Sequence, residues 1–220
     1  IHKLSIKYST GTGVPQDKIL AFKWLKKSAE KGNTAAQSDL AWHYYLADTS
    51  QINRELAFKW FRESVYGDQK DAENRLILSY LYEEGKGTKV NKKEAVFWLK
   101  ESAELGYLKA QNLLAWKYEK GKDVQKSIAH AMDWYKKSAE KGDAEAQNAL
   151  ARLYYNKGHA TSANKKKALK WYQKSAEKGF ADSQYNLAWR YARGVDITKD
   201  TKLAFEWFLK SAEQAHVRAE

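Results

Sequence analysis

The stretch "KWLKKSAEKG" at residues 23–32 returns as "DWYKKSAEKG" at 133–142 and as "KWYQKSAEKG" at 170–179. A catalytic motif is needed once per active site, so three near-copies in 220 residues indicate a structural unit. The tryptophan of this stretch has counterparts along the chain at spacings of 36, 38, 36, 37 and 36 residues, namely Trp24, Trp60, Trp98, Trp134, Trp171 and Trp207. Six copies of one unit therefore fill the chain.

A second aromatic anchor runs in step with the tryptophan. It has spacings of 36, 36, 38, 36 and 37 residues, at Tyr8, Tyr44, Tyr80, Tyr118, Tyr154 and Tyr191. Around Trp171, the small and aromatic residues fall at positions i, i+3, i+4, i+7 and i+8, which is the pattern of one buried helix face. The residues around Tyr44 show a similar stripe. Each unit is therefore expected to hold two helices, one carrying the tyrosine and one carrying the tryptophan.

The ends of the tryptophan-bearing helices are marked by capping residues. The expected N-caps are short polar residues that can accept a hydrogen bond from the first turn: Asp17, Asn53, Asn91, Ser127, Asn164 and Asp200. The expected C-caps are glycines, which adopt a left-handed conformation at little cost: Gly32, Gly67, Gly106, Gly142 and Gly179. These marks predict hairpins of two helices, and neighbouring hairpins must stack to bury their apolar faces.

Composition excludes several classes of protein. Hydrophobic residues make up 43% of the chain, which is ample for a packed core, and no window is long and apolar enough to span a membrane. The chain has no cysteine, which excludes disulfides and thiolate chemistry and is compatible with a reducing or an oxidising compartment. We leave the compartment open, with a periplasmic or secreted location favoured over a cytoplasmic one. The formal net charge of +12 favours a partner with an acidic surface, an anionic membrane or nucleic acid.

The order of the anchors resembles the Sel1-like repeat family, a relative of the tetratricopeptide repeats. Residues 4–32, "LSIKYSTGTGVPQDKILAFKWLKKSAEKG", are nearly a full match to that pattern. The resemblance implies an all-α fold, a right-handed superhelical α-solenoid of about six helical hairpins in a single domain. The expected repeats are 1–32 (partial), 33–67, 68–106, 107–142, 143–179 and 180–215, with residues 216–220 starting a further one. Because the chain starts and stops inside repeats, we expect it to be a fragment or a processed product.

Some segments depart from the repeat pattern. Gly67 comes one residue early, and the stretch from Tyr80 to Ala95 is two residues longer than in most repeats. The loops at 45–54 and 155–166 lack the Gly-x-Gly turn. Loops of this kind are where binding specificity is usually carried.

The candidate catalytic and metal-binding residues lack the partners that such chemistry needs. Ser28, Ser138 and Ser175 each precede a lysine by three residues, as in penicillin-recognising serine enzymes, but Ser-Asp-Asn and Lys-Thr-Gly are missing. The five histidines do not form i, i+4 pairs, so we expect no metal site and no cofactor. The basic run from Lys165 to Lys167 leaves nucleic-acid binding as a disfavoured alternative.

The resemblance to tetratricopeptide folds implies a concave groove lined by the tyrosine-bearing helices. The residues expected to point into it are Ser38, Trp42, Tyr45, Asn74, Leu78, Leu81, Asn112, Trp116, Glu119, Asn148, Arg152, Tyr155, Tyr185, Trp189 and Arg193. Trp, Tyr and Arg are typical of protein-binding hot spots, and Asn amides can hold a bound backbone. The alternative is that the tryptophan rings pack inside against the next repeat.

The sequence therefore predicts a non-enzymatic scaffold that binds a protein or peptide in the groove. By resemblance, family members act as adaptors in bacterial envelope signalling, host interaction and quality control, and some are immunity proteins that neutralise a toxic enzyme. The alternatives are a serine hydrolase of the penicillin-recognising type and a binder of anionic polymers.

Overall fold

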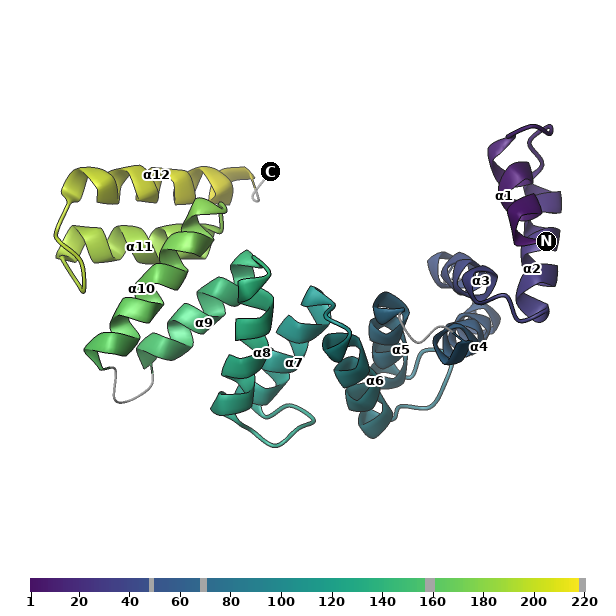
Figure 1. Ribbon diagram of the computed structural model, residues 1–220, viewed down its shortest axis with the longest axis horizontal. Coiled ribbons are helices and arrows are strands. Elements are labelled where there is room, and N and C mark those ends of the chain that lie inside the picture. The colour runs from purple at the N-terminus through teal and green to yellow at the C-terminus, as the bar shows by residue number, and fades with distance from the viewer. Residues whose placement is uncertain (48–49, 68–70, 157–160, 218–220) are drawn as a thin grey trace. The chain divides into compact units, whose positions relative to one another are not determined.

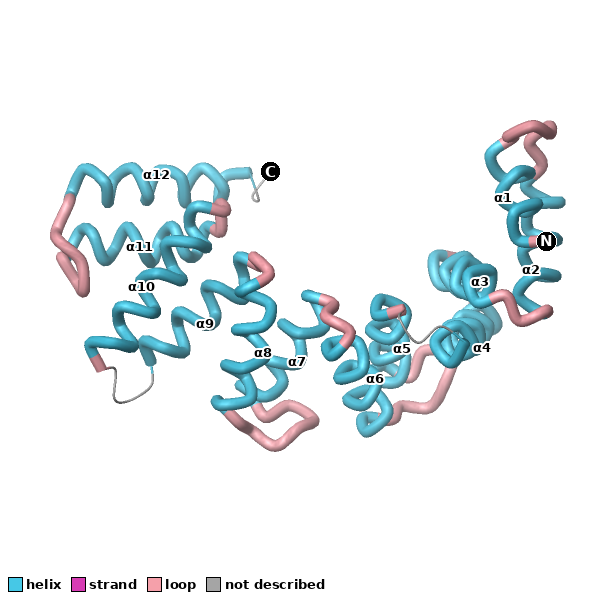
Figure 2. Tube along the Cα trace, viewed as in Figure 1, coloured by secondary structure: helices cyan, strands magenta, loops and turns pink. Residues whose placement is uncertain are grey.

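The computed structural model describes residues 1–47, 50–67, 71–156 and 161–217. Within these ranges the chain forms twelve α-helices. Helices joined by loops make up the described chain, without a strand (Figure 2). This confirms the all-α helical repeat fold that the periodicity predicted. No helix in the described part is both long and apolar enough to cross a bilayer. The chain divides into two compact units, Ile1–Ala110 and Gln111–Glu220.

The first unit holds six complete helices, which pair in chain order (Figure 1). They are α1 (His2–Thr10), α2 (Lys18–Glu30), α3 (Thr34–Leu46), α4 (Gln51–Gly67), α5 (Ala72–Glu84) and α6 (Lys92–Glu104). The helix α7 (Leu108–Lys120) begins in this unit and continues into the second. The core of the first unit is built around Phe61, Leu40 and Leu78, which come from three successive helices.

The second unit continues the same pattern of paired helices. After α7 it contains α8 (Ile128–Glu140), α9 (Ala144–Asn156), α10 (Ser162–Glu177), α11 (Ala181–Arg193) and α12 (Thr201–Val217). Fully buried alanines on successive helices, such as Ala151 and Ala168, let the backbones approach closely. The anchor rings Tyr154 and Trp171 are partly buried and pack against this core.

A recurring buried hydrogen bond ties three of the tyrosine-bearing helices, α3, α9 and α11, to the tryptophan-bearing helix before each of them. The amide of Gln37 donates to the carbonyl of Ala29, that of Gln147 to Ala139, and that of Gln184 to Ala176, at 3.3, 3.0 and 3.2 Å. Each of these carbonyls lies in the last turn of its helix and also accepts the backbone N–H of the glycine three residues later, at 2.9, 3.0 and 2.9 Å. The glutamine therefore adds a second hydrogen bond to that helix end and ties its own helix to it.

Most of the expected caps are present, but two N-caps and one C-cap were wrong. As predicted, a side-chain oxygen accepts a hydrogen bond from the first turn at Asp17, Asn91, Ser127 and Asp200. Helices α4 and α10 instead begin three residues earlier than expected, and their caps are Ser50 and Thr161. Asn53 and Asn164 therefore lie inside helices.

The C-cap that was wrong is Gly67. Gly67 is the last residue of α4 and is not left-handed. A Cβ at this position would overlap Cγ2 of Thr34, so the glycine permits a close approach to the start of α3.

The register of α5 differs by two residues from the sequence-based expectation. In three turns, the N-cap amide donates to the carbonyl of the tyrosine nine residues earlier: Asp17 to Tyr8, Ser127 to Tyr118 and Asp200 to Tyr191, at 2.9, 2.9 and 3.0 Å. Before α6 the same bond runs from Asn91 to Tyr82, at 2.9 Å, and not to Tyr80. Tyr82 is therefore the true anchor.

This register moves the two additional residues to a different place in the chain. They lie in the junction before α5 and not between Tyr80 and Ala95. Part of that junction, like part of the loops at 45–54 and 155–166 and of the segment 216–220, is outside the described residues.

The turn before α6 gives a prediction for stability. Gly13 and Gly87 occupy the same turn position with φ of 74° and 72°, but a Cβ at Gly87 would overlap the backbone of Arg54. We expect Gly87→Ala to lower the unfolding free energy by about 1–3 kcal/mol more than Gly13→Ala, because only Gly87→Ala adds this clash. Urea unfolding of both variants measures the difference. Equal losses would show that the turn can move away from α4.

Candidate functional site

The corrected register of α5 changes the predicted binding face. Asn74, Leu78 and Leu81, expected to face a partner, are 1%, 0% and 1% exposed. The prediction was wrong for all three. Asn74 and Leu78 occupy the positions of the core residues Ala36 and Leu40 in α3, and Leu81 packs in the same core cluster as Leu78. The counterparts of Ser38, Trp42 and Tyr45 in α5 are Leu76, Tyr80 and Glu83. The 38-residue spacing from Trp60 to Trp98 was the sequence signal for this shift, since it equals the spacing from Tyr44 to Tyr82.

Asn74 joins three elements of the first unit. Its amide nitrogen donates to Oγ of Ser38 at 2.7 Å and to Oγ of Ser64 at 3.1 Å. Its oxygen accepts from the indole nitrogen of Trp42 at 3.0 Å. The Trp42 ring also packs edge-on against Phe61, with ring centroids 5.4 Å apart. Trp42 is therefore held by the next repeat, which is the packing alternative considered above.

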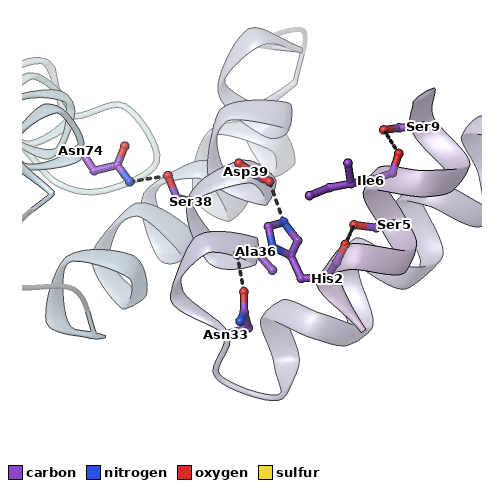
Figure 3. Close-up of polar contacts among 9 residues, drawn as sticks. All are labelled: His2, Ser5, Ile6, Ser9, Asn33, Ala36, Ser38, Asp39 and Asn74. Atoms are coloured by element: carbon purple, nitrogen blue, oxygen red, sulfur yellow. Dashed lines mark hydrogen bonds and ion pairs between the residues drawn. The ribbon is translucent and has the colours of Figure 1, made fainter. Parts of the chain in front are cut away.

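Helix α3 makes polar contacts on two sides. Figure 3 shows Ser38 facing Asn74 of α5 on one side and Asp39 facing His2 of α1 on the other. The distance from His2 Nε2 to Asp39 Oδ2 is 2.8 Å. These bonds, together with the cap from Asn33 to the amide of Ala36, fix α3 between its neighbours.

The second unit presents its predicted aromatic residues to solvent. Trp116 on α7 and Trp189 on α11 are each 37% exposed, and Tyr185 is 52% exposed. The guanidinium of Arg193 lies 3.2 Å from the centre of the Trp189 ring, and Lys122 lies over Trp116 at 5.4 Å. Large exposed rings flanked by cations are suited to contact a partner of mixed apolar and acidic character.

Three predicted residues meet at one pocket of about 640 Å³, namely Asn148 and Arg152 on α9 and Tyr185 on α11. The remaining polar lining consists of Asp182, Asn186, Ser211 and Gln214, from α11 and α12. The pocket therefore offers amide, hydroxyl, carboxylate, guanidinium and phenol groups within a single unit. Sequence reasoning had not included these four residues. Asp182 and Asn186 lie beside Tyr185 on α11, whereas Ser211 and Gln214 reach the pocket from α12, which packs on α11.

Glu119 supports Arg152 and was wrongly expected to face a partner. Glu119 is 6% exposed, and its Oε2 lies 2.6 Å from Nη2 of Arg152. Burial alone would raise the pKa of Glu119, but the hydrogen bond and charge of Arg152 outweigh it and hold the pKa below its ordinary value. The same bond raises the pKa of Arg152. Burial, followed by the charge of Glu119, raises the pKa of Tyr135.

Several other predicted residues make internal contacts within their own unit. The amide of Asn112 donates to Asp143 Oδ1 at 2.9 Å, and the oxygen of Asn148 accepts from Ser183 Oγ at 2.8 Å. The half-buried Tyr155 lies under the guanidinium of Arg190, 4.5 Å from the ring centre. Tyr45 packs edge-on against Trp42.

The serines of the Ser-x-x-Lys pattern lie in the core. Ser28, Ser138 and Ser175 are all buried. Oγ of Ser175 donates to the carbonyl of Ala144 at 2.6 Å and accepts from Ser183 at 2.7 Å. The described ranges hold no cluster of three or more potential metal-ligating His, Cys, Asp or Glu residues.

The similarity to known proteins extends over most of the chain. The family model described as Sel1 repeat matches residues 1–33, 34–66, 76–107, 108–143, 144–180 and 181–216. The unmatched residues 67–75 include the junction before α5, where the register changes.

Solved structures support the same relationship. A Sel1 repeat protein from Oxalobacter formigenes is 30% identical, covers 97% of this chain and 86% of its own, and superposes with a TM-score of 0.72. The protective antigen c5321 of uropathogenic Escherichia coli, which has an SLR fold, is 31% identical over 97% of this chain, with a TM-score of 0.64. This chain spans only 53% of c5321. YrrB is described as a TPR protein with an unusual peptide-binding site. It is 18% identical to this chain with a TM-score of 0.52, and the match covers 86% of this chain and 91% of YrrB. At this identity the similarity is one of fold alone.

Proposed function

This chain belongs to the Sel1 repeat family, and from that premise we propose that it is a non-enzymatic scaffold that binds a protein or peptide on its odd-numbered helices. Sel1 repeats form a fold suited to protein–protein interaction. The observation that carries the proposal is the row of exposed aromatic residues in the second unit, Trp116, Tyr185 and Trp189. Trp and Tyr side chains are enriched among the residues that anchor protein–protein interfaces.

The pocket at Arg152 gives this face its polar specificity. Glu119 holds the guanidinium in place from behind, while the Arg152 side chain remains 40% exposed. Asn148 and Asn186 line the same pocket and offer amide groups that can pair with an extended backbone. A peptide segment with an aromatic or aliphatic anchor and a nearby carboxylate fits this combination of groups.

The net charge of +12 supports a partner with an acidic surface. Neutralisation of a toxic enzyme is the most specific form of the proposal, because a rigid basic scaffold can cover an acidic surface. An enzymatic role of Ser138 or Ser175 is disfavoured by their burial. A purely electrostatic binder of anionic polymers would not need the aromatic row.

Capture of binding proteins from a lysate of the source organism tests the proposal. We expect the wild-type chain to capture a partner protein. The double variant Trp116→Ala, Trp189→Ala should capture at least ~10-fold less of that protein, because two hot-spot rings are removed. Phe205→Ala is the matched control, because Phe205 is also exposed but lies on α12. Circular dichroism checks that all three proteins keep their helices.

Each outcome of this experiment has a definite meaning. Loss from the double variant alone supports the proposed face. Equal retention by all variants contradicts it and moves the partner to another surface. A retained nucleic acid or other polymer that is released by salt from every variant supports the electrostatic alternative.

A further inference from the structure

The even-numbered helices carry a second feature that the proposed scaffold function does not use. Five of the six anchor tryptophans have a lysine of the same chain over the ring. The distances from the ammonium to the ring centre are 5.1 Å at Trp24, 5.0 Å at Trp60, 3.8 Å at Trp134, 4.7 Å at Trp171 and 4.4 Å at Trp207. In four of these repeats the lysine follows the tryptophan by three residues. The anchor tryptophan is therefore generally paired with an ammonium group.

Trp98 breaks this pattern. The residue three positions later is Glu101, and the preceding residue, which is Lys59 in the repeat before, is Phe97. Among the residues that the structure describes, no lysine or arginine lies over the Trp98 ring. A carboxylate stands where the other repeats have a cation.

The missing cation coincides with a pocket of about 590 Å³ between α4, α5 and α6. Three rings line it: Trp98 is buried, while Tyr66 and Phe97 are 67% and 50% exposed. The ring centroids of Tyr66 and Phe97 lie 5.7 and 5.1 Å from that of Trp98, and both are nearly perpendicular to it, at 83° and 81°. Because Tyr66 and Phe97 are each nearly perpendicular to Trp98, the aromatic walls of the pocket meet at an angle.

The charged residues of the pocket favour a positive ligand. Glu94 and Glu101 line it from α6 and lie on the same face of that helix, seven residues apart. Arg75 is also in the lining, but it is buried and donates to the backbone carbonyls of Asp71 and Val65 at 2.8 and 3.3 Å. Among the lining residues that the structure describes, two carboxylates therefore face one guanidinium, which donates to backbone carbonyls.

We propose that this pocket binds an organic ammonium cation supplied by a ligand, in the place that a lysine of the chain takes at the other anchor tryptophans. Aromatic faces attract a cation through the quadrupole of the ring, and they attract alkylated ammonium groups well because these are weakly hydrated. The carboxylates of Glu94 and Glu101 add charge attraction at the rim.

Titration followed by NMR of the tryptophan indole signals tests this site. The ligands are choline, a short lysine-containing peptide, and 3,3-dimethylbutanol, which is a neutral isostere of choline. We expect saturable shifts of one indole signal with choline or the peptide, with a dissociation constant in the millimolar range or tighter. The neutral alcohol should bind at least ~10-fold more weakly, because it lacks the charge.

Glu101→Lys is the decisive variant. It restores the lysine that other repeats carry at this position, so we expect the fold to be kept and ligand binding to fall at least ~10-fold as the new ammonium covers Trp98. Glu104→Lys changes the net charge equally but lies outside the pocket, and should bind like the wild type. Phe97→Leu tests the ring with little change in hydrophobicity, and should weaken binding.

The outcomes separate the possible sources of the cation and can overturn the proposal. Tighter binding of choline assigns the site to a small quaternary ammonium compound, and tighter binding of the peptide assigns it to a partner's lysine side chain. The proposal would be overturned if neither cation caused a saturable shift at concentrations up to ~50 mM, a range set by the expected affinity. Equal binding of the neutral alcohol, or unchanged binding to Glu101→Lys, would also overturn it.

Discussion

Replacing Leu78 by alanine is expected to lower the unfolding free energy by about 3 kcal/mol, within the 2–5 kcal/mol range for buried leucines. Leu78 is fully buried and packs in the core of the first unit, with Leu40 and Phe61 from neighbouring helices. Truncation removes transfer free energy and leaves a cavity between α3, α4 and α5. Urea unfolding followed by circular dichroism measures the loss.

Leu46→Ala is the matched control for this experiment. Leu46 is an exposed leucine at the end of α3, and its truncation should change the unfolding free energy by less than ~0.5 kcal/mol. If Leu78→Ala were as mild as Leu46→Ala, the two-residue shift in the register of α5 would be wrong. Leu78 would then lie on the surface, as the spacing from Tyr80 implied.

Replacing Arg152 by alanine is expected to cost about 2 kcal/mol, because it leaves the carboxylate of Glu119 buried without its closest cation. The figure is below that for a fully buried pair because the Arg152 side chain is 40% exposed and is partly screened by solvent. Adding Glu119→Gln to Arg152→Ala should recover most of the loss. No recovery would mean that Arg152 stabilises the protein by packing alone.

The same pair makes stability depend on pH in one direction. The folded pKa of Glu119 lies below its ordinary value of 4.5, so the folded state binds this proton more weakly than the unfolded state. The contribution of the pair is therefore present above pH ~4.5 and is lost as pH falls through the folded pKa. The unfolding free energy of the wild type should fall more steeply between pH 5 and 3, roughly the range of this titration, than that of Glu119→Gln. Parallel curves would contradict the ion pair.

The fold could be predicted because its signals are repeated. The anchors, the capping residues and the small core residues occur in register several times, so an error in one repeat does not change the architecture. Individual caps were less certain. Asn53 and Asn164 match the N-cap pattern as well as Asn91 does, but Ser50 and Thr161 start their helices a turn earlier. Local sequence could not decide between two suitable cap residues three positions apart.

The candidate site was harder to predict because it depends on exposure and on neighbours from other helices. Tyr80 and Tyr82 are both compatible with the anchor, and choosing Tyr80 placed Asn74 and Leu78 on the surface. Trp42 and Trp116 occupy equivalent positions, yet only Trp42 has an asparagine from the next repeat bonded to its indole. Equivalent position in a repeat therefore does not give equivalent exposure.

The most direct test of the central claim is amide hydrogen exchange of the chain with and without the protein that it captures. If the odd-numbered helices of the second unit form the binding face, peptides from α9 and α11 around Arg152, Tyr185 and Trp189 should exchange more slowly in the complex. Peptides from α8 and α10 should change little. Protection confined to the even-numbered helices or to the first unit would contradict the account.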